Sequence, residues 1–165
     1  MTQELSATLE DYLTAVYRLE CEKRVARPRD IAREQKVAKS TVTAALKSLA
    51  AKELINYEPY EAVTLTPEGV EQVRPLIMRH RILVDFLRDI LGLEASQATD
   101  VACGMEHAIA EDALERIVCF LAFTRQSGSE GEHLLDEFRQ FLRTCGEGKI
   151  CRECIEKYWE ETPKP

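Results

Sequence analysis

The apolar positions at the start of the chain recur with the period of an α-helix. They follow the spacing i, i+3, i+4, i+7 and i+8, which gathers them on one face of a helix: Leu9, Tyr12, Leu13, Val16 and Tyr17. Ser6 and Thr8 lie just before this run, and either can act as the N-cap of the helix. The pattern therefore predicts an amphipathic helix close to the N-terminus.

A short helix, a tight turn and a longer helix are predicted next. Pro28 suits the first turn of a helix that continues through Ile31 and ends near Gln35. After a turn at residues 36–39, a second helix begins at Lys39 or Ser40. Its apolar positions share one face and are expected to be buried: Val42, Ala45, Leu46 and Leu49. This arrangement predicts a helix-turn-helix.

The period then changes to that of extended chain. Residues 54–57 and 62–66, on either side of a turn at 58–61, predict a two-stranded β wing. Thr66 and Pro67 provide an N-cap and a first-turn proline for a long helix, which Pro75 should kink and Gly92 should end. Three further helices are expected over residues 96–110, 111–124 and 131–144, with a loop at 126–131.

Charge is distributed unevenly along the chain. The net charge of the whole chain is −7, yet residues 21–52 contain nine Lys or Arg and three Asp or Glu, a local charge of +6. The remaining residues therefore carry −13. A small basic module attached to an acidic body is typical of a nucleic-acid-binding domain, whereas a solvated charged face on a helical hairpin is the simpler alternative.

The outer face of the second helix of the predicted helix-turn-helix is rich in small polar side chains, as a helix in the major groove of DNA requires. Basic side chains are expected to contact phosphates, while Ser, Thr and Ala contact base edges and thymine methyl groups. The predicted DNA-binding residues are Arg27, Arg29, Arg33, Lys39, Ser40, Thr41, Thr43, Ala44 and Lys47.

Several classes of protein are excluded. No stretch free of charged residues exceeds eight residues, so no membrane-spanning segment is predicted. The acidic N-terminus is unlike a signal peptide, so we expect a cytoplasmic protein whose six cysteines are reduced, metal-bound or redox-active. The chain has no HExxH motif and no glycine-rich phosphate loop, which argues against an enzyme.

A candidate metal site lies in the second half of the chain. Cys103, Glu106 and His107 follow the spacing i, i+3 and i+4, which would place all three on one face of a helix. His80 is a candidate fourth ligand and Asp11 a candidate fifth. Thiolate, carboxylate and imidazole together suit a divalent transition metal. The alternative is a small core cysteine beside an ordinary surface glutamate and histidine.

The order of these motifs resembles the diphtheria toxin repressor family, which includes the manganese transport regulators. The resemblance covers about two-thirds of the chain and is carried by residues 9–13 with Tyr17, 30–32, 41–43, 65–69, 79–81 and 106–107. It implies a homodimeric, metal-dependent transcriptional repressor of metal-homeostasis genes, bound to a double-stranded DNA operator. The implied fold is mainly α: a winged helix-turn-helix with a small two-stranded β wing (residues 1–70), followed by an all-α metal-binding and dimerisation domain (71–144). We expect residues 145–165 to form a separate cysteine-containing tail.

The resemblance also implies which residues hold the metal. The family's primary site falls on Asp11, Cys103, Glu106 and His107, and a second-site histidine falls on His80. Asp11 is the residue type of the manganese branch and Cys103 that of the iron branch. Because a thiolate prefers softer ions than Mn²⁺, this donor set favours Fe²⁺ over Mn²⁺. An ion bridging Asp11 and the helix of Cys103 would fix the first helix relative to the dimerisation domain.

Departures from the family pattern weaken the case for a second ion. Thr14 stands where the manganese branch has a glutamate. Val84 and Thr99 stand where the iron branch has a carboxylate and a histidine.

The last cysteines form a separate motif outside the resemblance. Cys145, Cys151 and Cys154 have the spacing C-x5-C-x2-C, and Cys119, His133 or a partner chain could complete a zinc site or an iron–sulfur ligand set. Reduced structural thiols and a disulfide or redox switch are the alternatives. The second functional hypothesis is accordingly a winged-helix regulator that senses redox state, or a zinc or iron–sulfur centre, through these cysteines.

Overall fold

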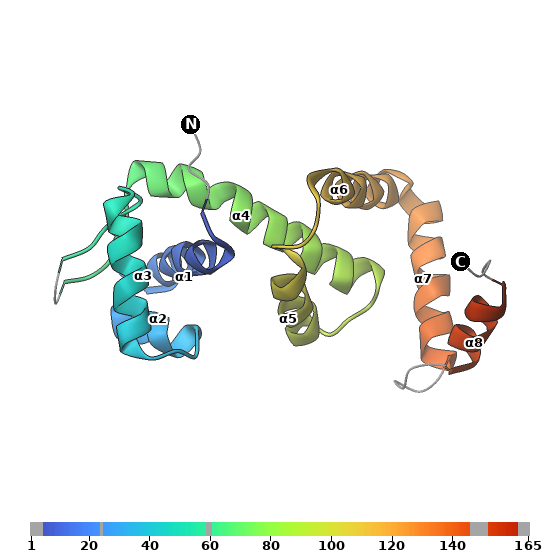
Figure 1. The fold of residues 1–165 in the computed structure, drawn as a ribbon. Coiled ribbons are helices and arrows are strands. Elements are labelled where there is room, and N and C mark those ends of the chain that lie inside the picture. Colours follow the sequence, from blue (N-terminus) through green and yellow to red (C-terminus); the bar gives the residue numbers. More distant parts are fainter. Residues whose placement is uncertain (1–4, 24, 59–60, 146–151, 162–165) are drawn as a thin grey trace.

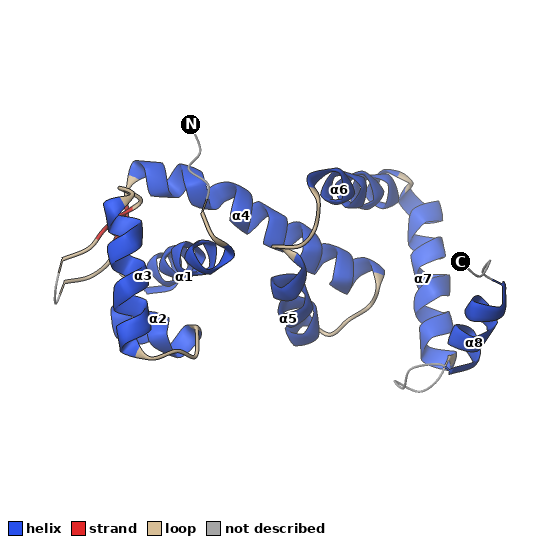
Figure 2. Cartoon of the chain, viewed as in Figure 1, coloured by secondary structure: helices blue, strands red, loops and turns tan. Residues whose placement is uncertain are grey.

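The computed structural model describes residues 5–23, 25–58, 61–145 and 152–161, and these are mostly helical (Figure 2). The first part contains α1 (Ala7–Lys23), α2 (Pro28–Glu34), α3 (Lys39–Ala51), the strands β1 (Ile55–Asn56) and β2 (Thr64–Leu65), and the long helix α4 (Pro67–Asp85). The second part contains the π-helical segment η1 (Phe86–Ile90), α5 (Ala95–Met105), α6 (Glu111–Gln126), α7 (Gly128–Thr144) and α8 (Arg152–Glu161).

The predicted helix-turn-helix is present and its apolar face is buried. The four predicted core positions of α3 are all buried, with Val42, Leu46 and Leu49 fully enclosed. Pro28 occupies the first turn of α2, and the backbone N–H of Leu9 donates a 3.4 Å hydrogen bond to Ser6 Oγ at the start of α1. The helical period of the sequence therefore located α1 and α3, and the first-turn proline located α2.

The wing is smaller than the sequence pattern predicts. β1 and β2 are antiparallel, with Ile55 opposite Leu65 and Asn56 opposite Thr64. A further antiparallel bridge joins Ala26 to Val63, whose backbone N–H donates to the Ala26 carbonyl at 2.8 Å. This bridge attaches the wing to the residues just before α2. Because it involves a single pair of residues, no repeating sequence pattern predicts it.

Helix α4 begins as predicted. Thr66 caps it, because its hydroxyl oxygen accepts a 3.0 Å hydrogen bond from the backbone N–H of Gly69. A Cβ atom at Gly69 would overlap the carbonyl group of Leu54, so only glycine fits where α4 crosses the end of the helix-turn-helix. The helix continues through Pro75 and then through η1, and Gly92, at a φ of 71°, ends it.

The elements pack along α4 in two groups, α1 to α3 at one part of the helix and α5 at another (Figure 1), and each group has its own hydrophobic core. The first contains apolar residues of α1, α2, α3 and the wing, and includes Val73 of α4. The second contains Leu83 of α4 together with Leu87, Ala98 and Leu114. The predicted domain boundary at residue 70 therefore lies inside a helix whose two halves belong to different cores.

Three predictions for the second half of the chain were wrong in detail. The helix predicted over 96–110 ends at Met105, and a turn at residues 106–108 follows it. The loop predicted at 126–131 is absent, because α7 begins at Gly128 directly after α6. Gly131 allows this sharp connection, since a Cβ atom there would press on the Thr124 carbonyl. The predicted tail contains α8, which was not expected. None of the described helices combines the length and the apolar character that crossing a membrane requires.

Candidate metal centre and nucleic-acid interface

Three potential metal ligands from distant parts of the chain converge between α1 and the end of α5. The ligand atoms of Asp11, Glu106 and His107 all lie within 4.8 Å of one another. His107 Nε2 is 3.0 Å from Asp11 Oδ1 and 3.6 Å from Glu106 Oε1. Because Asp11 belongs to α1 and the other two residues follow α5, this cluster joins the two regions of the molecule.

His107 is held from both sides of its ring. While Nε2 faces Asp11, Nδ1 lies 3.1 Å from Glu10 Oε2. An Nδ1–H group donating to Glu10 leaves Nε2 with its lone pair directed at Asp11 and Glu106, which is the tautomer a metal ligand needs. Glu10 was not among the predicted site residues, because neighbours in a helix sequence point about 100° apart and only the observed position of His107 brings both carboxylates to one ring.

The protonation of His107 reflects these neighbours. Partial burial alone would lower the pKa of the imidazole, since it disfavours the charged form. The hydrogen bond and charge of Asp11 oppose this, and the hydrogen bond to Glu10 and the charge of Glu106 add to them, so the net effect raises the pKa of His107. Without a metal, the carboxylates therefore stabilise the imidazolium form of His107 relative to that of a free histidine.

Glu106 has a second histidine partner. His80 of α4 places Nδ1 2.6 Å from Glu106 Oε2, and both side chains are largely buried. Arg79 donates from Nη1 to the Glu106 carbonyl at 3.3 Å and from Nη2 to Glu111 at 3.0 Å. These contacts fix the turn after α5 against α4. His80 is therefore placed to orient the Glu106 carboxylate.

Cys103 is placed differently from the sequence expectation. Glu106 keeps helical backbone angles and its N–H donates to the Ala102 carbonyl, so Cys103 lies nearly one helical turn before it. The Cys103 thiol is nevertheless not part of the cluster formed by Asp11, Glu106 and His107. It is still close enough to respond electrostatically. Burial raises the pKa of the Cys103 thiol, and the negative charges of Glu106 and Asp11 raise it further.

The donor set fits a divalent transition-metal ion. Two donor atoms bound at about 2.1 Å to an octahedral ion lie about 3.0 Å apart, close to the observed separation of His107 Nε2 and Asp11 Oδ1. A cavity of about 10 Å³ adjoins the cluster and is lined by Glu10, Thr14, Leu76, Arg79, Glu106 and His107. Two carboxylates and one imidazole are suitable ligands for Mn²⁺ and Fe²⁺.

A hydrogen bond connects this cluster to the helix-turn-helix. Gln35, the residue that ends α2, donates from Nε2 to the backbone carbonyl of Asp11 at 3.3 Å. Arg18 of α1 also approaches Glu34 of α2 at 3.9 Å. The position of α1 is thereby coupled to α2, the helix that supports α3.

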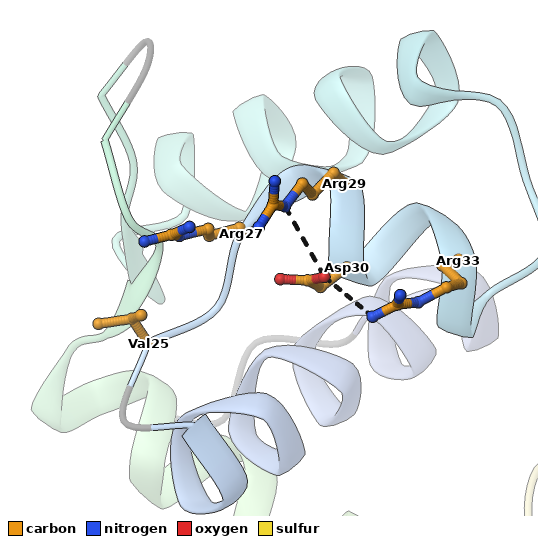
Figure 3. A pocket seen from close by; sticks show the side chains of 5 residues that line it. All are labelled: Val25, Arg27, Arg29, Asp30 and Arg33. Carbon is orange, nitrogen blue, oxygen red and sulfur yellow. Dashed lines mark hydrogen bonds and ion pairs between the residues drawn. The ribbon is translucent and has the colours of Figure 1, made fainter.

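The basic residues around α2 line an open cavity of about 730 Å³. Asp30 lies between Arg29 and Arg33, with ion pairs of 3.9 Å and 3.0 Å, while the Arg27 side chain extends toward the wing (Figure 3). The guanidinium groups of Arg29 and Arg33 remain largely exposed. This arrangement offers three forked cationic groups to a negatively charged backbone.

The predicted base-reading face of α3 is also accessible. A second cavity of about 670 Å³ brings Arg27, Arg29, Lys39 and Thr43 together with Tyr57 of the wing. Thr43 is half-buried, and its hydroxyl donates to the Lys39 carbonyl at 3.0 Å. The remaining predicted residues of this helix are exposed: Lys39, Ser40, Thr41, Ala44 and Lys47. A single surface therefore combines α2, α3 and the wing.

The predicted cysteine cluster is only partly assembled in the described residues. Cys145 and Cys154 place their Sγ atoms 3.1 Å apart. Cys119 instead lines a cavity with Pro75 and Met78. Among the residues that the structure describes, Cys119 and His133 do not join the other two cysteines as a three-ligand group. Cys151 lies outside the described residues.

Comparison with known proteins gives consistent matches over most of the chain. Residues 4–63 match the N-terminal DNA-binding domain of iron-dependent repressors, and residues 66–134 match their metal-binding and dimerisation domain. An uncharacterized HTH-type transcriptional regulator of Methanocaldococcus jannaschii is 34% identical over 118 residues, which cover 71% of this chain and 94% of that protein. The HTH-type transcriptional regulator MntR of Bacillus pumilus is 34% identical over 127 residues, which cover 77% and 88%.

A similar fold is present in a solved structure, described as a manganese-dependent transcriptional repressor in complex with manganese. It matches with a TM-score of 0.62 and 28% identity, over 70% of this chain and 53% of that chain. The present chain therefore spans about half the length of that structure.

Proposed function

This chain belongs to the iron-dependent repressor family of metal-dependent, DNA-binding transcriptional regulators, and we propose that Asp11, Glu106 and His107 bind its regulatory metal ion. The observation that supports this is the contact between α1 and the turn after α5, where Nε2 of His107 lies 3.0 Å from Asp11 Oδ1. Glu10 and His80 orient the ligands through the other nitrogen of His107 and the second oxygen of Glu106.

The proposed consequence is a coupling between the metal site and the DNA-binding surface. A bound divalent ion supplies positive charge that allows Asp11 and Glu106 to remain close without repulsion. Asp11 then holds α1 against the turn after α5, and the bond from Gln35 to the Asp11 carbonyl holds α2 to α1. This would favour one orientation of α3, and in a homodimer the distance between the two α3 helices sets which DNA half-sites they reach.

The proposed DNA contacts follow from the same surface. The arginines at 27, 29 and 33 and the lysines at 39 and 47 would bind phosphates. Ser40, Thr41, Thr43 and Ala44 would face the edges of the bases. The operator itself is proposed to control genes for metal homeostasis, and the homodimer is proposed to form through residues 71–144.

The direct experiment measures DNA binding by the full chain, at fixed salt and without oxygen, with chelator, Mn²⁺ or Fe²⁺, using DNA from upstream of its own gene. Salt must be constant because phosphate contacts make affinity strongly salt-dependent. The wild type should bind DNA only when metal is present. Metal should no longer stimulate DNA binding by H107A. H133A is the matched control, because His133 is an exposed histidine on α7. Equal stimulation of H107A and H133A by metal would contradict the proposed site.

Which ion activates the chain depends on whether the Cys103 thiol is one of the metal ligands. The three clustered ligands are two carboxylates and one imidazole, a harder set than the Cys103-containing set that favoured Fe²⁺, so we propose that Mn²⁺ and Fe²⁺ both activate the chain. If the Cys103 thiol lies outside the loaded site, C103S should change both activation midpoints equally. A selective weakening of Fe²⁺ activation in C103S would instead assign the thiolate as a ligand.

A further inference from the structure

Two cysteines meet where α7 and α8 adjoin, far along the chain from the metal cluster. Cys145 directly follows α7, and its backbone N–H donates to the Phe141 carbonyl at 2.8 Å. Cys154 is the third residue of α8. Their Sγ atoms are 3.1 Å apart. The backbone of each cysteine is therefore held at the end of a helix, which fixes the position of its thiol.

The separation of the two sulfur atoms indicates which chemistry they support. Two thiolates bound to tetrahedral zinc at about 2.3 Å lie about 3.8 Å apart. The observed pair is closer than this, and an approach of about 1 Å would bring it to the disulfide bond length of about 2.05 Å. The two sulfur atoms are therefore in direct contact, and a small movement is sufficient for a disulfide bond to form between them.

Solvent can reach both positions. Cys154 is exposed and Cys145 is half-buried. Cys154 can accordingly be attacked by, or attack, a small reagent in solution, while Cys145 is held within reach of it. The three other described cysteines have different surroundings. The thiol of Cys21 is hydrogen-bonded with Tyr17, Cys103 is close to the carboxylates of the metal cluster, and Cys119 lines the cavity with Pro75 and Met78.

We propose that Cys145 and Cys154 are a reversible modification site, which forms an intramolecular disulfide by exchange with a small-molecule disulfide such as oxidised glutathione. The Cys154 thiolate attacks one glutathione sulfur, forms a mixed disulfide and releases one glutathione thiolate. The Cys145 thiolate then attacks Cys154 Sγ and releases the second glutathione. The two protein thiols lose two protons and two electrons in total, and oxidised glutathione gains them as two reduced molecules.

The bond would fasten the start of α8 to the end of α7. It would close a short loop over residues 146–153, and reduction by free glutathione would open it again. The site is independent of the proposed metal ligands, since none of the residues of that cluster belongs to α7 or α8.

The test equilibrates the full-length protein with glutathione buffers of graded ratio, quenches the thiols by alkylation and determines intact mass and disulfide connectivity. We expect the wild type to lose two hydrogen atoms and to yield a peptide joined through Cys145 and Cys154. C145S should instead accumulate glutathione on Cys154, because the second thiol is missing. C119S and C21S are matched controls and should form the same bond as the wild type.

Two results would overturn the proposal. One is a wild-type protein that accumulates glutathione adducts at Cys154 without an internal bond, as C145S should. The other is a disulfide that joins either cysteine to Cys151 in preference to its proposed partner. C151S distinguishes the two pairings directly, since it should retain the bond between Cys145 and Cys154.

Discussion

The two regions joined by α4 bury their apolar residues to very different extents. In the first region, large side chains such as Leu13, Leu46 and Leu54 are fully enclosed. In the second region, Phe123, Leu134 and Phe141 are more than half exposed. The first region therefore completes its own core, whereas the second leaves apolar surface that the described residues of this chain do not cover. This difference matches the family's division into a DNA-binding domain and a dimerisation domain.

The metal cluster lies where these regions meet. Glu10 and Asp11 come from the self-contained region, and Glu106 and His107 come from the region with exposed apolar surface. A polar contact of this kind can be made or released without disrupting either core. The comparison thus separates residues that maintain the fold from residues that set how the two regions are arranged.

The largest effect we predict comes from one chemical change made in both regions. L46A should lower the free energy of unfolding by about 2–5 kcal/mol, because it leaves a cavity in an enclosed core. L134A removes the same atoms from a side chain that is 55% exposed, and should change stability by less than about 0.5 kcal/mol in the monomer. Denaturant unfolding at low protein concentration measures both. Equal losses would show that the second region is as self-contained as the first.

A smaller effect is expected on self-association. Phe123 is 60% exposed on α6, within the residues that match the family's dimerisation domain. A buried aromatic side chain at the centre of an interface typically contributes about 2 kcal/mol or more. F123E should therefore weaken dimerisation at least tenfold in sedimentation equilibrium, while leaving the helical content unchanged.

Q126E is the control for the dimerisation experiment, because it adds the same charge to α6 without removing an apolar group. It should dimerise like the wild type. If F123E and Q126E weaken association equally, charge rather than the loss of apolar contact would be responsible, and Phe123 would lie outside the interface.

The same difference explains what could be predicted from the sequence. In the first region, most large apolar side chains are buried within the chain, so helical period located α1 and α3. Pro28 located the start of α2, and Thr66 with Pro67 located the start of α4. In the second region, apolar residues face outward as well as inward. The ends of the helices were therefore less well defined, and both the break after Met105 and the helix α8 were missed.

The candidate site divides in the same way. Glu106 and His107 were predicted as metal ligands from their helical spacing, with Asp11 as a further candidate that the family resemblance supported, and the structure brings these three together. Cys103 was included because its helical spacing would place it on the same face as Glu106 and His107, and the structure leaves its thiol outside the cluster formed by Asp11, Glu106 and His107. Glu10 depends on the distance between α1 and a residue 97 positions away, which no local pattern records.

The smallest effect concerns the contact between the two regions and its dependence on pH. In the metal-free protein, the pKa of His107 is raised above its usual value of about 6.5 by its hydrogen bonds with Asp11 and Glu10. A raised folded-state pKa stabilises the protein fully below the unfolded pKa, and this contribution is lost as pH rises through the folded value. The metal-free wild type should therefore lose part of its stability over the pH interval that begins near the usual value of about 6.5 and extends through the raised pKa of His107. E10Q removes one cause of the raised pKa, so its stability should fall less than that of the wild type over the same interval. E22Q is the control, because Glu22 is exposed on α1, and its stability should follow that of the wild type. Denaturant midpoints of the three proteins in chelator, measured across this interval, test the prediction, and identical curves for E10Q and the wild type would mean that Glu10 does not interact with the His107 ring in solution.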